Sequence, residues 1–210
     1  MTQSLKTALV LVTAALAAAC NGNGNLRVDG RLSEASASQE SQGSLPLGDG
    51  ALVIESARVA VSQIEFEGGD EESDELEAEV GGGTIDLALD GSKTEVAANS
   101  VDSGVYHTLG MELRSHAITV EGTYGGTSFT YLSDVSPELE FALKPPVEVP
   151  AGGEASVGVE FDVGAWFVAP DGSVLDPTDE ANRPTIEGNI MASMAAHAEV
   201  EDGDDGPSDD

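Results

Sequence analysis

Aromatic and acidic side chains gather in the segment DVGAWFVAPDGSVLDPTDEANR, residues 162–183, which contains the only tryptophan of the 210-residue chain. Trp166 and Phe167 are adjacent, so in an extended segment they point to opposite faces and one ring is expected to be exposed. An exposed ring beside Asp171, in the Pro-Asp-Gly turn, could stack on a sugar ring or anchor a protein partner. These residues therefore predict a ligand-binding surface; the alternative is a tryptophan that caps the core beside a charged loop.

Three further carboxylates in this segment, Asp176, Asp179 and Glu180, are candidate ligands for a calcium ion. Ca²⁺ is bound by several carboxylate and carbonyl oxygens, which such an acidic connection supplies. A second acidic stretch, residues 65–83, holds nine carboxylates but lacks the ligand spacing of an EF-hand, and we interpret it as a solvated loop. Calcium is thus the one cofactor that the sequence suggests, and the alternative is a charged rim without an ion.

Residue types that serve zinc or nucleophilic chemistry are few and scattered. His107 is expected on the apolar side of a strand, His116 in a tight turn, and His197 near the C-terminal tail. A zinc site needs clustered ligands, and a serine or cysteine nucleophile needs a neighbouring base, and the spacing indicates neither. Carboxylate pairs, the groups of glycosidases, occur in any acid-rich chain. We therefore expect a protein that is not an enzyme, with a carboxylate-based glycosidase as the alternative.

The single cysteine of the chain, Cys20, stands at the end of its most apolar segment. Lys6 followed by an apolar run from Ala8 to Ala19 is typical of a secretory signal peptide over residues 1–19. The letters LAAAC resemble a lipobox, the bacterial signal for lipidation of a cysteine, although Ala17 stands where leucine is usual. Acyl chains on Cys20 would anchor the chain to a membrane, and the alternative is a plain secreted protein. Asn21 in place of aspartate favours the outer membrane or the cell surface.

The chain carries 39 acidic and 8 basic residues, a net charge of −31. This charge repels nucleic acids and anionic lipid headgroups, so binding to nucleic acid is not expected. An acid-rich surface of this kind is typical both of a saline habitat and of an exported protein that must stay soluble. With one cysteine, no disulfide forms within the monomer, and the fold must depend on its core.

Composition divides the chain after the signal peptide into three parts. Residues 20–50 are rich in Gly, Ser, Asn and Gln and are predicted to be a flexible, disordered tether. Residues 51–199 have the size of one domain. Residues 200–210, EDGDDGPSDD after Val200, are predicted to be a disordered acidic tail.

Within the domain, apolar residues alternate with polar ones, which predicts β-strands. The apolar face changes parity after Val61, which predicts a β-bulge near Ser62–Gln63, and Gly125-Gly126 predicts a two-residue hairpin turn. Pro145 and Pro146 mark a connection or an edge strand. The segment TIEGNIMASM is either a last strand or a helix. About seven or eight short strands predict an all-β, antiparallel sandwich.

Four strand-and-turn motifs together resemble a family of uncharacterised bacterial lipoproteins, the domain of unknown function 4382. They are ARVAVSQIEF, IDLAL, VDSGVYHTLGMEL and FALKPPVEVPAGGEASVGVEFDV, and the resemblance spans roughly residues 51–195. It implies an immunoglobulin- or transthyretin-like sandwich and transfers no catalytic residues. The acidic insert at 67–79 departs from the family pattern.

The function expected from these observations is that of a non-enzymatic cell-envelope lipoprotein. Its membrane-tethered β-sandwich would serve as a binding, adhesion or structural module, with an envelope protein or a glycan as partner. The alternative is a secreted, lipid-anchored hydrolase of the carboxylate-based glycosidase type.

Overall fold

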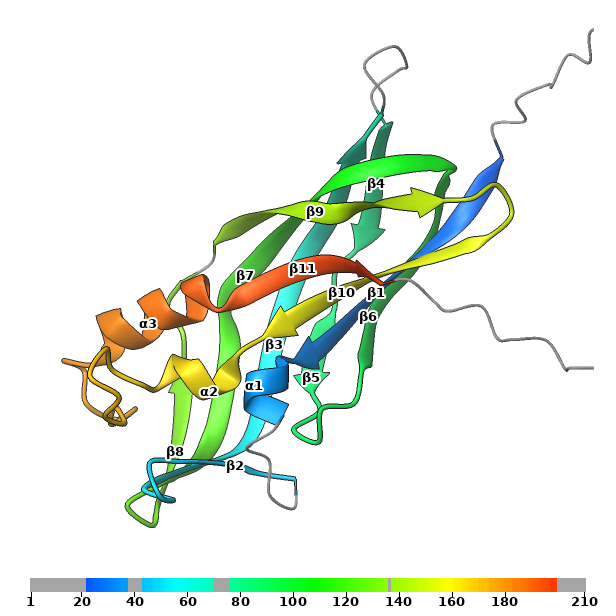
Figure 1. The fold of residues 1–210 in the computed structure, drawn as a ribbon. Helices are drawn as coiled ribbons and strands as arrows, with labels where there is room; N and C mark the ends of the chain where they lie inside the picture. Colours follow the sequence, from blue (N-terminus) through cyan, green and yellow to red (C-terminus); the bar gives the residue numbers. More distant parts are fainter. Residues whose placement is uncertain (1–21, 38–42, 70–75, 136, 200–210) are drawn as a thin grey trace, which may run out of the picture.

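The computed structural model describes residues 22–37, 43–69, 76–135 and 137–199, and these form two β-sheets that face each other, with helices at one end (Figure 1). The elements in chain order are β1 (Asn23–Leu32), α1 (Glu34–Ala37), β2 (Leu45–Leu47), β3 (Leu52–Gly68), β4 (Leu76–Gly81), β5 (Thr84–Leu87), β6 (Thr94–Asp102), β7 (Gly104–Tyr124), β8 (Thr127–Leu132), β9 (Glu138–Val149), β10 (Glu154–Phe161), α2 (Val163–Trp166), α3 (Arg183–Ala192) and β11 (Met194–Glu199). The predicted all-β class is confirmed.

The strands form a four-stranded and a seven-stranded sheet. The smaller sheet has the order β11-β10-β1-β6, in which β1 and β10 are parallel. The larger sheet has the order β2-β3-β7-β8, with β4 and β5 also paired to β3 and β9 paired to β7. The described residues thus contain eleven strands, and the predicted count of seven or eight is wrong. The strands that were not predicted, β1, β2, β4, β6 and β11, are short or lie in segments that are rich in polar and small residues.

The first strand corrects the prediction of a flexible tether over residues 20–50. β1 lies between β10 and β6, and its Leu26 and Val28 are fully buried. β2 adds Leu45 and Leu47 to the core. The mean composition of this segment is polar because the outer face of β1 carries Asn, Arg and Asp, whereas apolar residues occupy the inner face. β1 and β2, which precede residue 51, are therefore part of the fold, while the signal peptide, Cys20 and the tail 200–210 lie outside the described residues.

Strands β3 and β7 are long enough to cross the whole molecule, and bulges adjust their faces. The predicted bulge is confirmed by a register shift between Val61 and Gln63. A second shift, between Tyr106 and Thr108, turns His107 outward, so the expectation that His107 lies on the apolar side is wrong. The predicted hairpin between β7 and β8 is confirmed, since Gly125 and Gly126 have φ of 57° and 79°, values that glycine adopts without strain.

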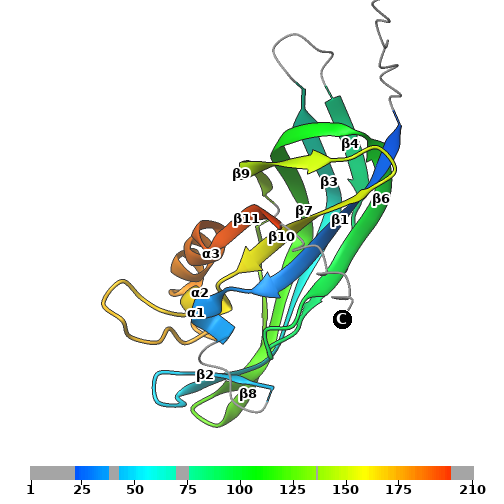
Figure 2. The ribbon, with the colours of Figure 1, turned by 45° about the vertical axis from the view of Figure 1, so that its right-hand side comes forward.

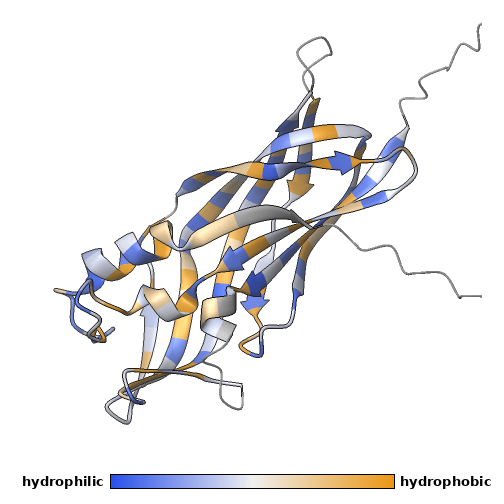
Figure 3. Cartoon of the chain, in the orientation of Figure 1, coloured by the Kyte–Doolittle hydropathy of each residue, from blue (hydrophilic) through white to orange (hydrophobic). Residues whose placement is uncertain are grey.

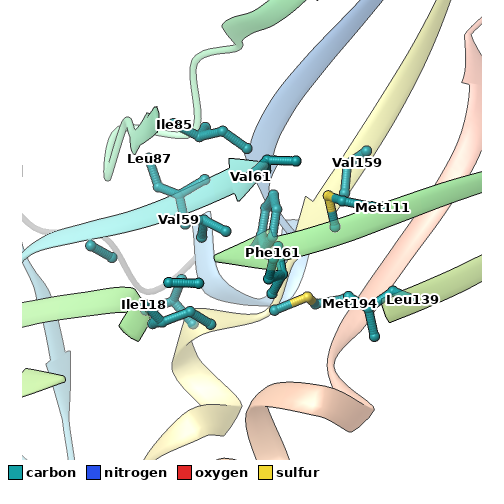
Figure 4. Packing of buried hydrophobic residues seen from close by; sticks show 14 of the residues in the cluster. Val59, Val61, Ile85, Leu87, Met111, Ile118, Leu139, Val159, Phe161 and Met194 are labelled. Atoms are coloured by element: carbon teal, nitrogen blue, oxygen red, sulfur yellow. The ribbon is translucent and has the colours of Figure 1, made fainter. Parts of the chain in front are cut away.

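The core lies between the two sheets and extends under the helices. Apolar and polar residues alternate along the strands, as Figure 3 shows by colour. Side chains from both sheets interdigitate: Val59, Ile118 and Met111 of the larger sheet lie near Val159 and Phe161 of the smaller one (Figure 4). This packing holds the fold without disulfides and sets the position of the helical end.

The helical end, consisting of α1, α2, α3 and the connection 167–182, lies at one end of the smaller sheet (Figures 1 and 2). The segment TIEGNIMASM, predicted as strand or helix, lies mostly in α3, which buries Ile186 and Ile190 one turn apart. β11 then begins at Met194. No described helix is long and apolar enough to cross a membrane.

Candidate functional site

Trp166 and Phe167, the two aromatic residues predicted to bind a ligand, are both fully buried at the helical end. The Trp166 indole Nε1 donates a hydrogen bond to the Ser193 hydroxyl at 2.7 Å. The Phe167 ring lies edge-on to the rings of Tyr131 and Phe129, with centroids 5.6 and 6.2 Å away. The expectation that one ring is exposed is wrong, because the chain forms the turn of helix α2 here and both residues face the core.

Asp171 and Asp176 each stabilise a turn of the connection in which they lie. The Asp171 carboxylate accepts hydrogen bonds from the Ser173 hydroxyl at 2.7 Å and the Ser173 N–H at 3.0 Å. These bonds favour the ionised form and lower the pKa of Asp171. Asp176 accepts the equivalent bonds from Thr178, at 2.7 and 2.8 Å. Both side chains thereby order the connection in which they lie.

The other two predicted metal ligands have local partners as well. Asp179 accepts a hydrogen bond from the Ala181 N–H at 2.9 Å, and Glu180 pairs with Arg183 at 3.2 Å. In the part of the chain that the structure describes, no three His, Cys, Asp or Glu side chains are grouped to hold a metal ion. Calcium binding by Asp176, Asp179 and Glu180 stays a prediction.

Arg183, which the sequence analysis missed, joins the helical end to the larger sheet. Its guanidinium donates a hydrogen bond to the Leu132 carbonyl at 2.8 Å and lies 3.2 Å from the Asp134 carboxylate. The same group lies over the ring of Tyr131, 5.1 Å from its centroid, a cation–π geometry. The signal that pointed to this role is its rarity, since Arg183 is one of only eight basic residues in an acidic chain.

A depression of about 460 Å³ lies between the three helices and is the candidate binding site. Its lining consists mostly of small side chains, namely Ala35, Asp162, Gly164, Ala165, Val168, Asn189, Ala192 and Ser193. Ser36, buried beside it, donates to the Asp162 carboxylate at 2.7 Å and accepts the Gly164 N–H at 2.8 Å. Asn189 donates to the backbone carbonyls of Trp166 and Val168.

These hydrogen bonds determine what the depression can recognise. The side-chain donors of Ser36 and Asn189 are directed to protein acceptors, and the Asp162 carboxylate and the Asn189 carbonyl oxygen bring acceptor capacity to the lining. The site therefore suits a ligand that donates hydrogen bonds, such as a hydroxyl-bearing glycan or a polypeptide, and its negative charge disfavours an anion.

A second, smaller depression of about 260 Å³ lies on the outer face of the larger sheet. Gly110 of β7 lines it and has no side chain to fill it, and Glu65, Glu112 and Glu138 from three neighbouring strands surround it. If the protein were a carboxylate-based hydrolase, this acidic face is where its pair of carboxylates would be sought.

Comparisons with known proteins identify no relative, since no family model, no curated protein and no solved structure matches this chain.

Proposed function

We propose that this chain is a lipid-anchored module of the bacterial cell envelope. It binds a partner through the helical end and catalyses no reaction. The anchor is Cys20, acylated after removal of residues 1–19. The proposed partner is an envelope protein or a glycan. The same proposal includes the finer fold class, an immunoglobulin- or transthyretin-like sandwich. It also includes membership of the domain-of-unknown-function family 4382.

The observation that carries this proposal is the position of β1. Only Asn21 and Gly22 separate Cys20 from the first residue of a strand in the interior of a sheet. β1 then runs ten residues to the start of the helical end, which at ~3.3 Å per residue is a path of roughly 30 Å. An anchor at Cys20 therefore places one end of the sandwich at the membrane and holds the depression between the helices away from it (Figure 1).

Replacement of the proposed lipid-bearing residue tests the anchor. We expect Cys20→Ser to move the protein from the membrane fraction to the soluble fraction when cells are fractionated. The matched control, Asn21→Ser, keeps the cysteine and should stay in the membrane fraction. Membrane association that is unchanged in Cys20→Ser would end the lipoprotein proposal. Substrate panels of glycans and esters, incubated with the purified protein, test the hydrolase alternative, and specific turnover would replace the proposal.

A cross-linking experiment on intact cells tests the helical end as the binding surface. We expect Ala165→Arg to abolish cross-linking to the partner, because a long charged side chain in the lining fills the depression without entering the core. Ala98→Arg, an equal change at an exposed position of β6, is the control and should leave cross-linking intact. Equal cross-linking in both variants would show that the partner binds a surface other than this depression.

A further inference from the structure

Strand β8 has one edge without a strand partner among the described residues. It pairs with β7 alone, in a hairpin whose register runs from Tyr124↔Thr127 to Thr119↔Leu132. The Ser133 N–H, just after β8, donates to the Ile118 carbonyl of β7, so odd-numbered residues face β7. The Leu132 carbonyl instead accepts from Arg183, on the opposite side. The backbone groups of Ser128 and Thr130 therefore point outward from the sheet.

The other sheet edges in the described part of the chain are short, interrupted by proline, or next to another edge. β2 has three residues and contains Pro46, and β9 contains Pro145 and Pro146. β9 lies beside β11, and β4 and β5 lie beside β6, so these edges face each other at the sides of the sandwich. Such features prevent unwanted pairing of sheet edges.

β8 has none of these protections. Its sequence, TSFTYL, contains no charged residue and no proline, and four of its six residues (Thr127, Phe129, Thr130 and Tyr131) are of types that favour strands. Ser128 and Thr130 are exposed, and Leu132, with 44% of its surface exposed, is the one exposed large hydrophobic residue among the described ones. In a chain of net charge −31, an uncharged edge with free backbone donors and acceptors is a template for another strand.

The charges around this edge determine which strand it suits. Glu121 lies opposite Thr130 on the neighbouring strand. Asp134 and Glu187 follow near the Leu132 end, where Arg183 pairs with both carboxylates and His116 lies 3.6 Å from Asp134. The net charge of the chain also repels a second copy of itself. A cationic segment would be attracted both by these carboxylates and by the protein as a whole.

We propose that the free edge of β8 binds an extended, cationic segment of another protein by β-strand addition. The outward N–H and C=O groups of Ser128 and Thr130 form the backbone hydrogen bonds, and Leu132 offers an apolar contact to one partner side chain. Lysine or arginine side chains of the partner face the carboxylates beside the edge. This surface is separate from the depression between the helices and does not depend on the lipid anchor.

Binding of synthetic peptides to the full chain tests this proposal. The probe is a fluorescein-labelled octapeptide of alternating lysine and threonine, measured by anisotropy, and the comparison is the same peptide with glutamate in place of lysine. We expect the lysine peptide to bind and the glutamate peptide not to bind. Hydrogen exchange of the Ser128 and Thr130 amides should slow when the lysine peptide is added, since these groups then lie inside a ladder.

Thr130→Pro is the decisive variant, because it removes an outward N–H and leaves the hydrogen bonds between β8 and β7 in place. We expect this substitution to lower the affinity for the lysine peptide by about tenfold, because one or two hydrogen bonds are lost and the edge is blocked. Glu121→Gln keeps the edge and should weaken binding less, with a smaller dependence on salt.

Three results would overturn the proposal. They are no binding of the lysine peptide, equal binding by the native protein and Thr130→Pro, and unchanged exchange of the Ser128 and Thr130 amides in the complex. If the native protein sediments as a dimer and Thr130→Pro as a monomer, the occupant of the edge is a second copy of the chain and not a cationic partner. If Thr130→Pro does not fold, the exchange measurement on the native protein decides by itself.

Discussion

Two buried tyrosines, Tyr106 and Tyr131, differ in whether the hydroxyl group has a hydrogen-bond partner. The Tyr106 hydroxyl donates to the Asp102 carbonyl at 2.9 Å, whereas the buried Tyr131 hydroxyl has no hydrogen-bond partner among the described residues. A buried polar group without a partner lowers stability, while a group with one contributes modestly. Burial raises the pKa of Tyr131 to about 12, and repulsion by the Glu187 carboxylate is the second cause of the rise.

The same substitution at these two tyrosines should therefore have opposite effects at neutral pH. We expect Tyr106→Phe to lower the free energy of unfolding by about 1 kcal/mol, and Tyr131→Phe to leave it unchanged or raise it. Urea unfolding followed by the fluorescence of Trp166, the single tryptophan, measures both. A loss of stability in Tyr131→Phe equal to that in Tyr106→Phe would show that the Tyr131 hydroxyl has a partner in solution.

Alkaline pH adds a second readout for Tyr131. Between pH 10 and 12 the unfolded chain loses the Tyr131 proton while the folded chain keeps it, so stability falls as the pH rises through this window. Below pH 10 this titration costs no stability, and the loss across the whole window amounts to roughly 2 to 3 kcal/mol, at ~1.4 kcal/mol for each unit of pKa difference. Tyr131→Phe should remove that part of the alkaline loss, and a pH profile identical to that of the native protein would contradict the assignment.

At the scale of elements, β1 is the strand on which the smaller sheet depends. It connects β10 with β6, and removing it would leave those two strands without their shared neighbour. Leu26 points into the core and is fully buried, while Asn25, the preceding residue, is exposed.

These two neighbours form a matched pair that distinguishes a core strand from a tether. We expect Leu26→Ala to lower the free energy of unfolding by about 2 to 5 kcal/mol, since it leaves a cavity between the sheets, and Asn25→Ala to change it by less than about 0.5 kcal/mol. Thermal or urea unfolding measures both. If neither substitution changed stability, β1 would not be part of the cooperative fold.

At the scale of the whole molecule, the proposed anchor and the first strand determine which end of the sandwich faces the membrane. The turn between β9 and β10 and the start of β1 lie at one end, where the Gly152 N–H donates to the Asn23 carbonyl. The β7–β8 hairpin lies at the opposite end (Figures 1 and 2). With the proposed anchor, a net charge of −31 would lie close to the bilayer and would repel anionic headgroups.

Protease sites inserted at the two ends test this orientation. We expect a site between Asn21 and Gly22 to be cut slowly in membranes, because the bilayer and the folded sandwich both lie next to it. The same site between Gly125 and Gly126 should be cut quickly. In Cys20→Ser, which releases the protein, the first site should become as accessible as the second. Equal cleavage of both sites in membranes would mean that the domain does not stand next to the bilayer.

Local patterns in the sequence were sufficient for the features that depend on neighbouring residues. The alternation of apolar residues determines the β class, Gly125-Gly126 determines the hairpin because both positions need positive φ, and the parity change after Val61 marks the bulge. The proposed localisation at a membrane also depends only on the residues around Cys20.

Only the tertiary structure decided the features that depend on residues far apart in the chain. β1 is polar on average and becomes a core strand because Asn25 to Leu32 pair with residues 154–161, more than a hundred positions away. Trp166 and Phe167 are buried because α3, Ser193 and the rings of β8 surround them. The edge of β8 is free for the same kind of reason: whether a strand lies beside it depends on how the two sheets close, and no local pattern carries that information.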